Sequence, residues 1–237
     1  GNFTLQNIAQ LPNYQATFML SIWLGLVATV ICLIIAYPIA YIISQSSANV
    51  QRTMILLVML PMWMNLLIRT YSWMTILEDT GIINTLLTKI GLPPVHMINT
   101  QGAVVLGMVY NFLPYMILPI YTVMEKMDKS LVEACADLGG NRLHVVSKVI
   151  FPLSLPGVIS GLTMVFVPSV STFYISQKLG GTNSRLIGDV IEQQFKSANN
   201  YNLGAALSLI LMIMILICMA VMNHFSDEDD KGGRIVV

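Results

Sequence analysis

The chain has 237 residues, of which 55% are hydrophobic and 10% are charged, and its mean hydropathy is +0.72. Soluble domains usually carry about a quarter charged residues, so this composition indicates a protein embedded in lipid. The net charge is zero, which gives no reason to expect a nucleic-acid partner. The three cysteines have no pairing framework and no metal-type spacing, so we expect free thiols and no metal site.

Long stretches of the chain contain no Asp, Glu, Lys or Arg, and each could cross a bilayer, which needs about 20 apolar residues. These stretches are residues 1–51, 90–124, 149–177 and 197–226. The pattern predicts an all-α transmembrane bundle with five spans, near residues 17–44, 53–77, 100–124, 149–173 and 203–225. An extracytoplasmic segment, 1–16, would precede the transmembrane domain, 17–225, and a cytoplasmic tail, 226–237, would follow it.

Basic residues predict the orientation, because cytoplasmic loops of membrane proteins carry an excess of Lys and Arg. With 45–52, 125–148 and 226–237 inside, seven basic residues face the cytoplasm and four lie outside. The chain then begins outside, although its first residues are polar. We therefore expect a leading sixth span to precede this sequence.

The predicted spans are rich in proline and glycine. Proline removes a hydrogen bond from the helix and glycine lets helices approach closely, so we expect kinked, tightly packed spans. The prolines are Pro38, Pro61, Pro114, Pro119, Pro152, Pro156 and Pro168, and the glycines are Gly25, Gly107, Gly157 and Gly161. Kinks suit moving parts, but they are also common in membrane helices that never move.

The cytoplasmic loop (residues 125–148) contains signals for two short helices. Ser130 and Glu133 have the spacing of a capping box. Gly139 can end that helix with a left-handed turn, and Asn141 can cap a second helix that runs into the fourth span. Two short helices at an angle form a rigid element that could dock another protein. The alternative is an amphipathic connector lying on the lipid surface.

The cytoplasmic loop and the start of the fourth span also contain a spaced set of residues, Glu133-Ala134-Cys135, Gly139, Val149, Phe151-Pro152 and Pro156-Gly157. This set resembles the EAA motif of ABC importer permeases of the type I, MetI-like class, summarised as EAA, three residues, G, nine residues, I, one residue, LP. Cys135, Val149 and Phe151 replace alanine, isoleucine and leucine. These replacements change size rather than polarity.

The resemblance implies that the loop forms coupling helices that sit in a cleft of a cytoplasmic ATPase dimer. The residues that would make this contact are Glu133, Ala134, Asp137, Leu138 and Gly139. The sequence has no G-x-x-x-x-G-K-[ST] loop, so ATP and Mg²⁺ would bind to the ATPase subunit. This chain would then bind no cofactor and would be a transport subunit rather than an enzyme.

Further segments resemble the B-type permeases of spermidine/putrescine importers: Leu60-Pro61-Met62-Trp63, Asn65, Leu67–Tyr71, Leu186–Ile191 and Gln194-Phe195. That family implies six spans, a bacterial plasma-membrane location, a second homologous permease, an extracytoplasmic substrate-binding protein and polyamine cargo. Another small solute remains the alternative, namely an opine, an amino-acid derivative or an oxyanion. A passive channel is a weaker alternative, because a channel does not require a docking loop.

Polyamines are flexible cations, so anionic and aromatic groups are the candidates for their pathway. The acids expected at the outer mouth are Glu78, Asp79, Asp189 and Glu192. The rings that could offer cation–π surfaces are Trp63, Tyr71, Tyr110, Tyr115 and Phe173. Packing or interfacial anchoring is the alternative for each ring, and Trp73 is the clearest anchor.

Arg69 is a further pathway candidate, because an ionised residue in a membrane span is functional by default. A continuous helix from Thr53 would place Arg69 about 24 Å along its axis, in the outer third of the membrane. There it could also snorkel to the headgroups or pair with an outer acid. As a fixed cation it favours an oxyanion over a polyamine.

Overall fold

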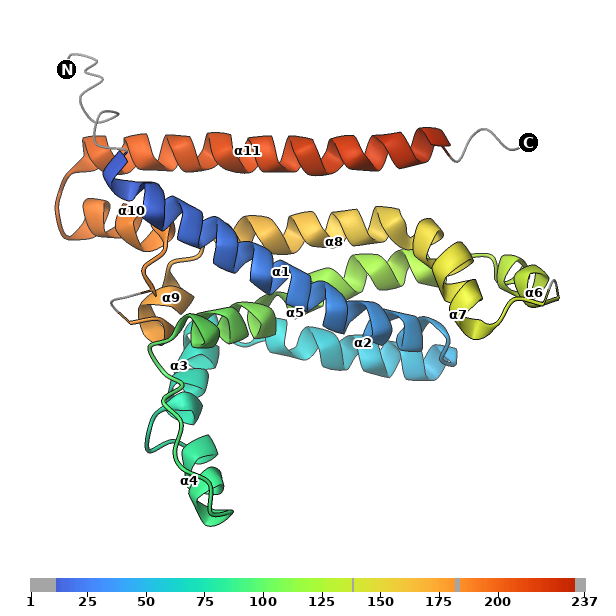
Figure 1. Ribbon diagram of the computed structural model, residues 1–237, viewed down its shortest axis with the longest axis horizontal. Coiled ribbons are helices and arrows are strands. Elements are labelled where there is room, and N and C mark those ends of the chain that lie inside the picture. Colours follow the sequence, from blue (N-terminus) through green and yellow to red (C-terminus); the bar gives the residue numbers. More distant parts are fainter. Residues whose placement is uncertain (1–11, 138, 182–183, 233–237) are drawn as a thin grey trace. The chain divides into compact units, whose positions relative to one another are not determined.

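The computed structural model describes residues 12–137, 139–181 and 184–232. Within these ranges the side chains of Lys129, Glu133, Ala136, Arg142, Leu143 and 223–232 are not described. The described residues form helices, turns and extended segments, without a strand (Figure 1). They divide into two compact units: unit 1 contains the described residues of Gly1–Val30, Met62–Asn111 and Phe166–Ile217, and unit 2 those of Ile31–Pro61, Phe112–Val165 and Cys218–Val237.

Membrane-spanning helices dominate the described part of the chain. The long helices are α1 (Gln15–Ser44), α5 (Gln101–Glu125), α8 (Phe151–Ser171) and α11 (Tyr201–Gly232). Within the described residues, 4 candidate spans meet the length and hydropathy requirements alone, and a bent helix pair raises the number to 5. Four of the five predicted spans therefore match candidate spans of the structure, and the second predicted span falls on the bent pair.

The second predicted span is not one continuous helix, so that part of the prediction is wrong. The structure has two helices here, α2 (Ala48–Trp63) and α3 (Leu66–Leu77), with a break at Met64 and Asn65. Asn65 causes the interruption: its backbone is extended and its Oδ1 accepts the Leu67 N–H at 2.8 Å. This is an N-cap, which starts a new helix. The estimate of Arg69's depth along one straight helix fails for this reason.

Shorter helices connect the spans. They are α4 (Ile82–Lys89), α6 (Lys129–Asp137), α7 (Arg142–Val145), the π-helix η2 (Val146–Ile150), α9 (Tyr174–Leu179) and α10 (Ile187–Lys196). Both α9 and α10 lie between the last two long helices, α8 and α11.

In unit 1, buried polar and small residues fix α10 against its neighbours. The Ser21 hydroxyl of α1 accepts the Ile187 N–H at 2.8 Å, and both residues are buried. A Cβ on Gly188 would lie 2.7 Å from the carbonyl oxygens of Ser171 and Thr172, so only glycine fits. Sequence-distant segments therefore meet at the start of α10.

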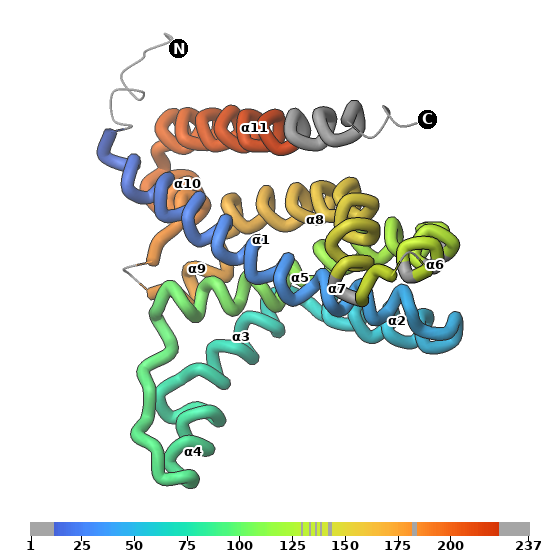
Figure 2. The backbone as a smooth tube through the Cα atoms, turned by 45° about the vertical axis from the view of Figure 1, so that its right-hand side comes forward, coloured from blue at the N-terminus to red at the C-terminus, as the bar shows by residue number. Residues whose placement is uncertain are grey.

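Unit 1 also contains α4 and the extended segment that returns from it to α5, visible as the green trace in Figure 2. Asn84 joins the two: its side-chain amide donates to the Val95 carbonyl at 2.9 Å and accepts the Val95 N–H at 2.8 Å. The Asn84 side chain thereby satisfies the backbone N–H and carbonyl of Val95 in place of a backbone partner.

In unit 2, α5 and α8 approach closely at glycines. A Cβ on Gly157 would lie 2.8 Å from the Pro119 carbonyl oxygen, and one on Gly161 would lie 2.7 Å from the Met116 sulfur. The Tyr37 hydroxyl of α1 also lies 3.0 Å from the Ser154 hydroxyl of α8. The close packing expected at the glycines is confirmed for this pair of helices.

Candidate functional site

The cytoplasmic loop begins with a helix cap that sequence analysis assigned to the wrong residue. The Asp128 carboxylate accepts the Ser130 N–H at 2.9 Å, and α6 begins at Lys129. Asp128 is therefore the N-cap, and Ser130 lies inside the first turn. The Ser130 N–H and hydroxyl hold the pKa of the Asp128 carboxyl below its usual value, so the capping group is an anion at the positive end of the helix.

The end of α6 is a sharp, glycine-dependent turn, as predicted. Gly139 has φ +83, in the left-handed region that favours glycine, and a side chain there would meet no other atom within 4 Å. The Gly140 N–H donates to the Cys135 carbonyl at 3.0 Å, the long bond of a Schellman motif. A Cβ on Gly140 would lie 2.7 Å from that carbonyl oxygen. Position 139 favours glycine because its backbone is left-handed, and position 140 requires glycine because a side chain would not fit.

The second helix of the cytoplasmic loop also starts as predicted. The Asn141 side chain accepts the His144 N–H at 2.8 Å, which caps α7. The chain then passes through η2, where the Phe151 N–H donates to the Val146 carbonyl five residues earlier. Pro152 follows and has no N–H for the Lys148 carbonyl, so a regular α-helical bond is impossible there. The wider turn joins α7 to α8, and such turns are frequent at functional sites.

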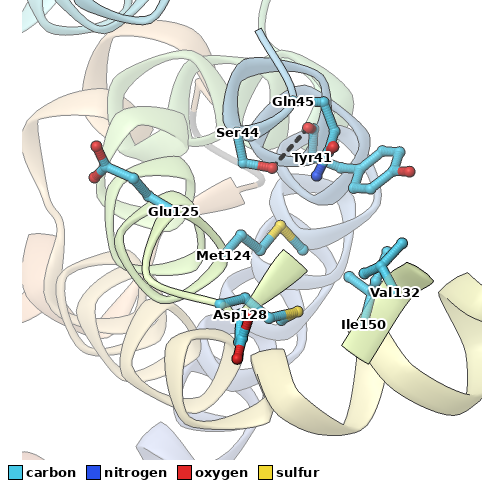
Figure 3. Close-up of a pocket in the computed structure, with 9 residues that line it drawn as sticks. Tyr41, Ser44, Gln45, Met124, Glu125, Asp128, Val132 and Ile150 are labelled. Atoms are coloured by element: carbon cyan, nitrogen blue, oxygen red, sulfur yellow. Dashed lines mark hydrogen bonds between the residues drawn. The ribbon is translucent and has the colours of Figure 1, made fainter. Parts of the chain in front are cut away.

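A cavity of about 150 Å³ lies behind α6 in unit 2 (Figure 3). Its lining comes from the ends of α1 and α5, from the turn after α5, from α6 and from η2: Tyr41, Ser44, Gln45, Met124, Glu125, Met127, Asp128, Val132 and Ile150. Val132 of α6 and Ile150 of η2 both line this cavity, as Figure 3 shows, and Ile150 is buried. The α6 helix also contacts η2, so the inner side of α6 is supported by the segment that leads into α8.

The outer face of the cytoplasmic loop is open. Ala134, Asp137 and Gly139 are exposed, and an open cleft of about 380 Å³ is lined by Cys135, Gly139, Gly140, Asn141 and His144. The predicted contact residues Leu138 and the Glu133 side chain lie outside the described residues. The arrangement is a short helix, supported from behind, with small residues and a cleft facing outward.

The predicted outer-mouth acids in unit 1 have different partners. Asp79 pairs with His96 at 2.8 Å, and Glu192 pairs with Lys196 at 2.7 Å and also bonds Gln177. The Lys196 contact lowers the pKa of Glu192. Glu78 is exposed. A paired carboxylate attracts an external cation less than a free carboxylate does.

Asp189, the fourth of these acids, is buried rather than exposed at a mouth. One carboxylate oxygen accepts the Leu186 N–H at 2.7 Å, whereas Oδ1 is buried and meets no hydrogen-bond partner in the part of the chain that the structure describes. Burial raises the pKa of Asp189 to about 6, although the Leu186 N–H and the Ser176 side chain favour its ionised form. Its position is that of a helix cap.

The aromatic candidates form separate pairs. Tyr71 meets Tyr174 edge to face, and Lys178 Nζ lies 5.2 Å from the Tyr71 ring centroid. Tyr110 packs against Trp73 with centroids 5.4 Å apart, which supports packing for both rings.

The remaining rings are open to the surroundings of the chain. In unit 2, Tyr115 contacts Phe112 at 6.5 Å. Trp63 and Phe173 in unit 1 are 73% and 39% exposed, so either ring can contact lipid, a partner or cargo.

Arg69 lies on α3 in unit 1. Its Nε and Nη1 atoms are buried and have no hydrogen-bond partner among the described residues. A guanidinium with unused buried donors favours an anionic or carbonyl partner from outside this chain.

Sequence analysis missed Tyr174 and Lys178. They stand four residues apart, which places both on one face of a helix. That spacing was a usable signal, but the contact with Tyr71 depends on tertiary structure.

The sequence model for the binding-protein-dependent transport system inner membrane component matches residues 14–227. The chain belongs to that family. It is therefore a multi-pass inner-membrane component of a transport system, and the EAA-like loop agrees with this membership.

The permease relatives match most of the chain. It is 38% identical to the spermidine/putrescine transport system permease protein PotB of Haemophilus influenzae, over 92% of this chain and 78% of the relative. It is 37% identical to PotB of Escherichia coli K12, over 90% and 79%. The inner membrane ABC transporter permease protein YdcU of E. coli is 28% identical over 95% of this chain and 77% of its own.

Solved structures share the fold. A chain of a bacterial ABC transporter that imports the acidic polysaccharide alginate superposes with a TM-score of 0.78 at 16% identity, covering 96% of this chain and 84% of its own. A chain of the MetNI methionine ABC transporter, in an inward-facing conformation, gives 0.63 at 15% identity, over 90% and 92%. The fold is that of an ABC importer permease.

Proposed function

We propose that this chain is the permease subunit of an ATP-driven polyamine importer. The observation that carries the cargo assignment is the similarity to spermidine/putrescine permeases over at least 90% of this chain. The remaining parts would be a second homologous permease, an ATPase dimer that binds ATP and Mg²⁺, and an extracytoplasmic substrate-binding protein. This chain would contribute the pathway and the coupling surface, without a nucleotide site of its own.

The geometry of the cytoplasmic loop supports a coupling role. Asp128 and Gly139 fix both ends of α6, and α6 contacts η2, whose Ile150 lines the same cavity as Val132. A force applied to the exposed face of α6 would therefore move the whole loop. Because α7 continues through η2 into α8, the movement would reach the membrane along a chain of connected helices. The proposed contact residues are Glu133, Ala134, Asp137, Leu138 and Gly139.

The test is ATP-dependent uptake of labelled spermidine and putrescine by vesicles containing the complete complex. We expect uptake by the wild-type complex. Glu133→Ala should lower the uptake rate about tenfold or more, the effect of deleting one partner of an interfacial charge contact. Cargo binding to the receptor should be unchanged.

Lys126→Ala is the control, since it removes an exposed charge that neither lies on α6 nor lines the cavity behind it. It should leave uptake close to wild type. Normal uptake by Glu133→Ala would contradict the coupling role, and uptake that continued without ATP would contradict an ATP-driven importer.

An anionic cargo is the second candidate, and Arg69 is the observation that favours it. Its buried, unpartnered Nε and Nη1 could bind a carboxylate or oxyanion. Uptake by the same vesicles distinguishes a polyamine cargo from an anionic cargo. An anionic cargo would be supported if the vesicles took up a labelled anion but no polyamine, and if Arg69→Gln abolished the anion uptake.

A further inference from the structure

An ammonium group of the protein itself occupies the face of one pathway candidate. Lys178 of α9 places its Nζ 5.2 Å from the centroid of the Tyr71 ring on α3. Tyr174 of α9 meets the same ring edge to face, with centroids 6.5 Å apart and planes at 78°. An ammonium within about 6 Å of a ring centroid is attracted by the negative face of the ring. The three residues, all in unit 1, form a cation–π contact.

The contact is open to competition. Tyr174 and Lys178 stand four residues apart on α9 and therefore share one face of that helix, opposite Tyr71. The Tyr71 ring is 44% exposed, and Lys178 and Tyr174 are half-buried. An alkylammonium ion from outside the chain can therefore reach this ring pair if Lys178 moves aside.

Aromatic rings, rather than a carboxylate, hold Lys178. In the part of the chain that the structure describes, the ion pairs join Lys196 to Glu192 and His96 to Asp79. Lys178 thus lacks the charge contact that would fix it permanently. Lys178 holds Tyr71 through the cation–π contact and a side-chain hydrogen bond, and an ammonium ion from outside the chain can replace both with contacts of the same kind.

The chemistry of the lysine side chain identifies the competitor. It consists of four methylene groups ending in a primary ammonium, which is also the structure of the aminobutyl end of putrescine and spermidine. A ring pair that accepts one accepts the other by the same attraction.

We propose that Tyr71 and Tyr174 form a subsite for the aminobutyl end of the cargo, and that Lys178 is a tethered competitor that occupies this subsite when cargo is absent. The inference rests on the proposed polyamine function and assigns one place where that cargo binds. Two ammonium groups cannot share one ring face, so cargo must displace Lys178. Competition from Lys178 therefore lowers the apparent affinity of the subsite for cargo, and Lys178 covers the rings between transport cycles.

Arg69 is the other basic residue near this subsite in sequence. It lies two residues before Tyr71, which is about 200° around a helix, so the two side chains leave α3 on different sides. Arg69 is therefore not a second competitor for the ring pair.

The test compares the KM for spermidine and putrescine uptake in vesicles containing the complete complex. Lys178→Met keeps the length of the side chain and removes its charge. We expect the KM for both polyamines to fall about two- to fivefold, the range expected for losing one exposed cation–π competitor, with little change in maximal rate. Tyr71→Leu in the Lys178→Met background should reverse this gain, because the aromatic face is then absent.

Two matched variants separate the subsite from general electrostatics. Lys178→Arg keeps a cation that binds rings and should behave like wild type. Lys89→Met removes an exposed cation of α4 in the same unit and should leave KM unchanged. An equal fall in KM for Lys89→Met and Lys178→Met would overturn the inference.

A small probe gives an independent readout. In Lys178→Ala, n-butylammonium has the chemistry of the deleted side chain and should inhibit polyamine uptake at lower concentration than in wild type. The neutral n-butanol should not. Equal inhibition of wild type and variant by n-butylammonium would count against the subsite.

Different uptake results would contradict the subsite and the polyamine cargo. Wild-type uptake with an unchanged KM in Lys178→Met would overturn the subsite and leave polyamine import standing. If the wild-type complex imported neither polyamine, the proposed cargo and the subsite would both be wrong.

Discussion

At the scale of single residues, Asp189 shows how a carboxyl can serve structure in a membrane protein. Its side chain is 6% exposed, caps α10 through the Leu186 N–H, and leaves Oδ1 without a hydrogen bond in the described part of the chain. Burial disfavours the ionised form and raises the pKa to about 6. The capping bond favours the anion but does not outweigh that effect.

Asp189 therefore predicts a pH dependence of stability. The folded state holds the proton more tightly than the unfolded chain, so the free energy of unfolding should fall as pH rises from about 4 to about 6. Asp189→Asn keeps an oxygen for the Leu186 N–H and has no charge to bury. It should remove this part of the pH dependence and stabilise the protein at pH 7.5 by on the order of 2 kcal/mol. Thermal unfolding of the purified complex across this pH range measures both effects.

Asp79→Asn provides the comparison, because Asp79 is an exposed acid with 61% of its side chain accessible. It should retain the wild-type slope over the same pH range. A wild-type slope in Asp189→Asn would show that another group causes the pH dependence.

At the scale of helices, the elements end where a particular residue provides the stop. Asn65 starts α3 and Asn141 starts α7 by accepting a backbone N–H, and Gly139 ends α6 in a left-handed conformation. The signals at Asn141 and Gly139 were readable from sequence because polar residues flank them. The signal at Asn65 was hidden because it lies inside an apolar stretch with the hydropathy of a span.

The packing of α5 against α8 predicts unequal costs for two similar substitutions. Gly157→Ala would place a methyl group 2.8 Å from the Pro119 carbonyl oxygen, which is backbone and cannot move freely. We expect a loss of about 1–3 kcal/mol in the free energy of unfolding. Gly161→Ala would meet the flexible end of Met116 at 2.7 Å. It should cost less than about 1 kcal/mol, measured as the shift in thermal unfolding. A larger loss for Gly161→Ala would contradict this packing.

At the scale of the whole molecule, the proposed orientation and docking can be tested with one native thiol. Cys135 lies half-buried in the cleft of the cytoplasmic loop, whereas Cys32 is buried. In a protein with Cys32→Ala and Cys218→Ala, a membrane-impermeant maleimide should label Cys135 only from the cytoplasmic side. Addition of the ATPase should slow labelling about tenfold or more if the cleft becomes buried in a stable interface.

The Cys32→Ala, Cys218→Ala protein with Cys135 also replaced by alanine is the control for background labelling. Labelling of Cys135 from the outside would reverse the proposed orientation. Unchanged labelling in the complete complex with the ATPase bound would mean that no partner covers this cleft.

Much of the molecule could be predicted from sequence because its strongest constraint is local. A helix in lipid satisfies its own backbone hydrogen bonds, so long uncharged stretches predict spans with few alternatives. The EAA-like spacing and the Gly139 and Asn141 signals likewise lie within one short segment. They led to the helical bundle, the two helices of the cytoplasmic loop and the family.

The contacts between residues distant in sequence could be identified only from the tertiary structure. Composition places Asp189 in a polar stretch and suggests an exposed acid, but the fold buries it beside Ser176. Tyr71 and Lys178 come from helices separated by about a hundred residues, and their contact depends on how α3 and α9 pack. By itself the sequence determined where the chain is helical and apolar, because those properties follow from neighbouring residues. Tertiary structure decided which charges are buried, paired or held by rings, because solvation and pairing depend on what distant segments bring to each site.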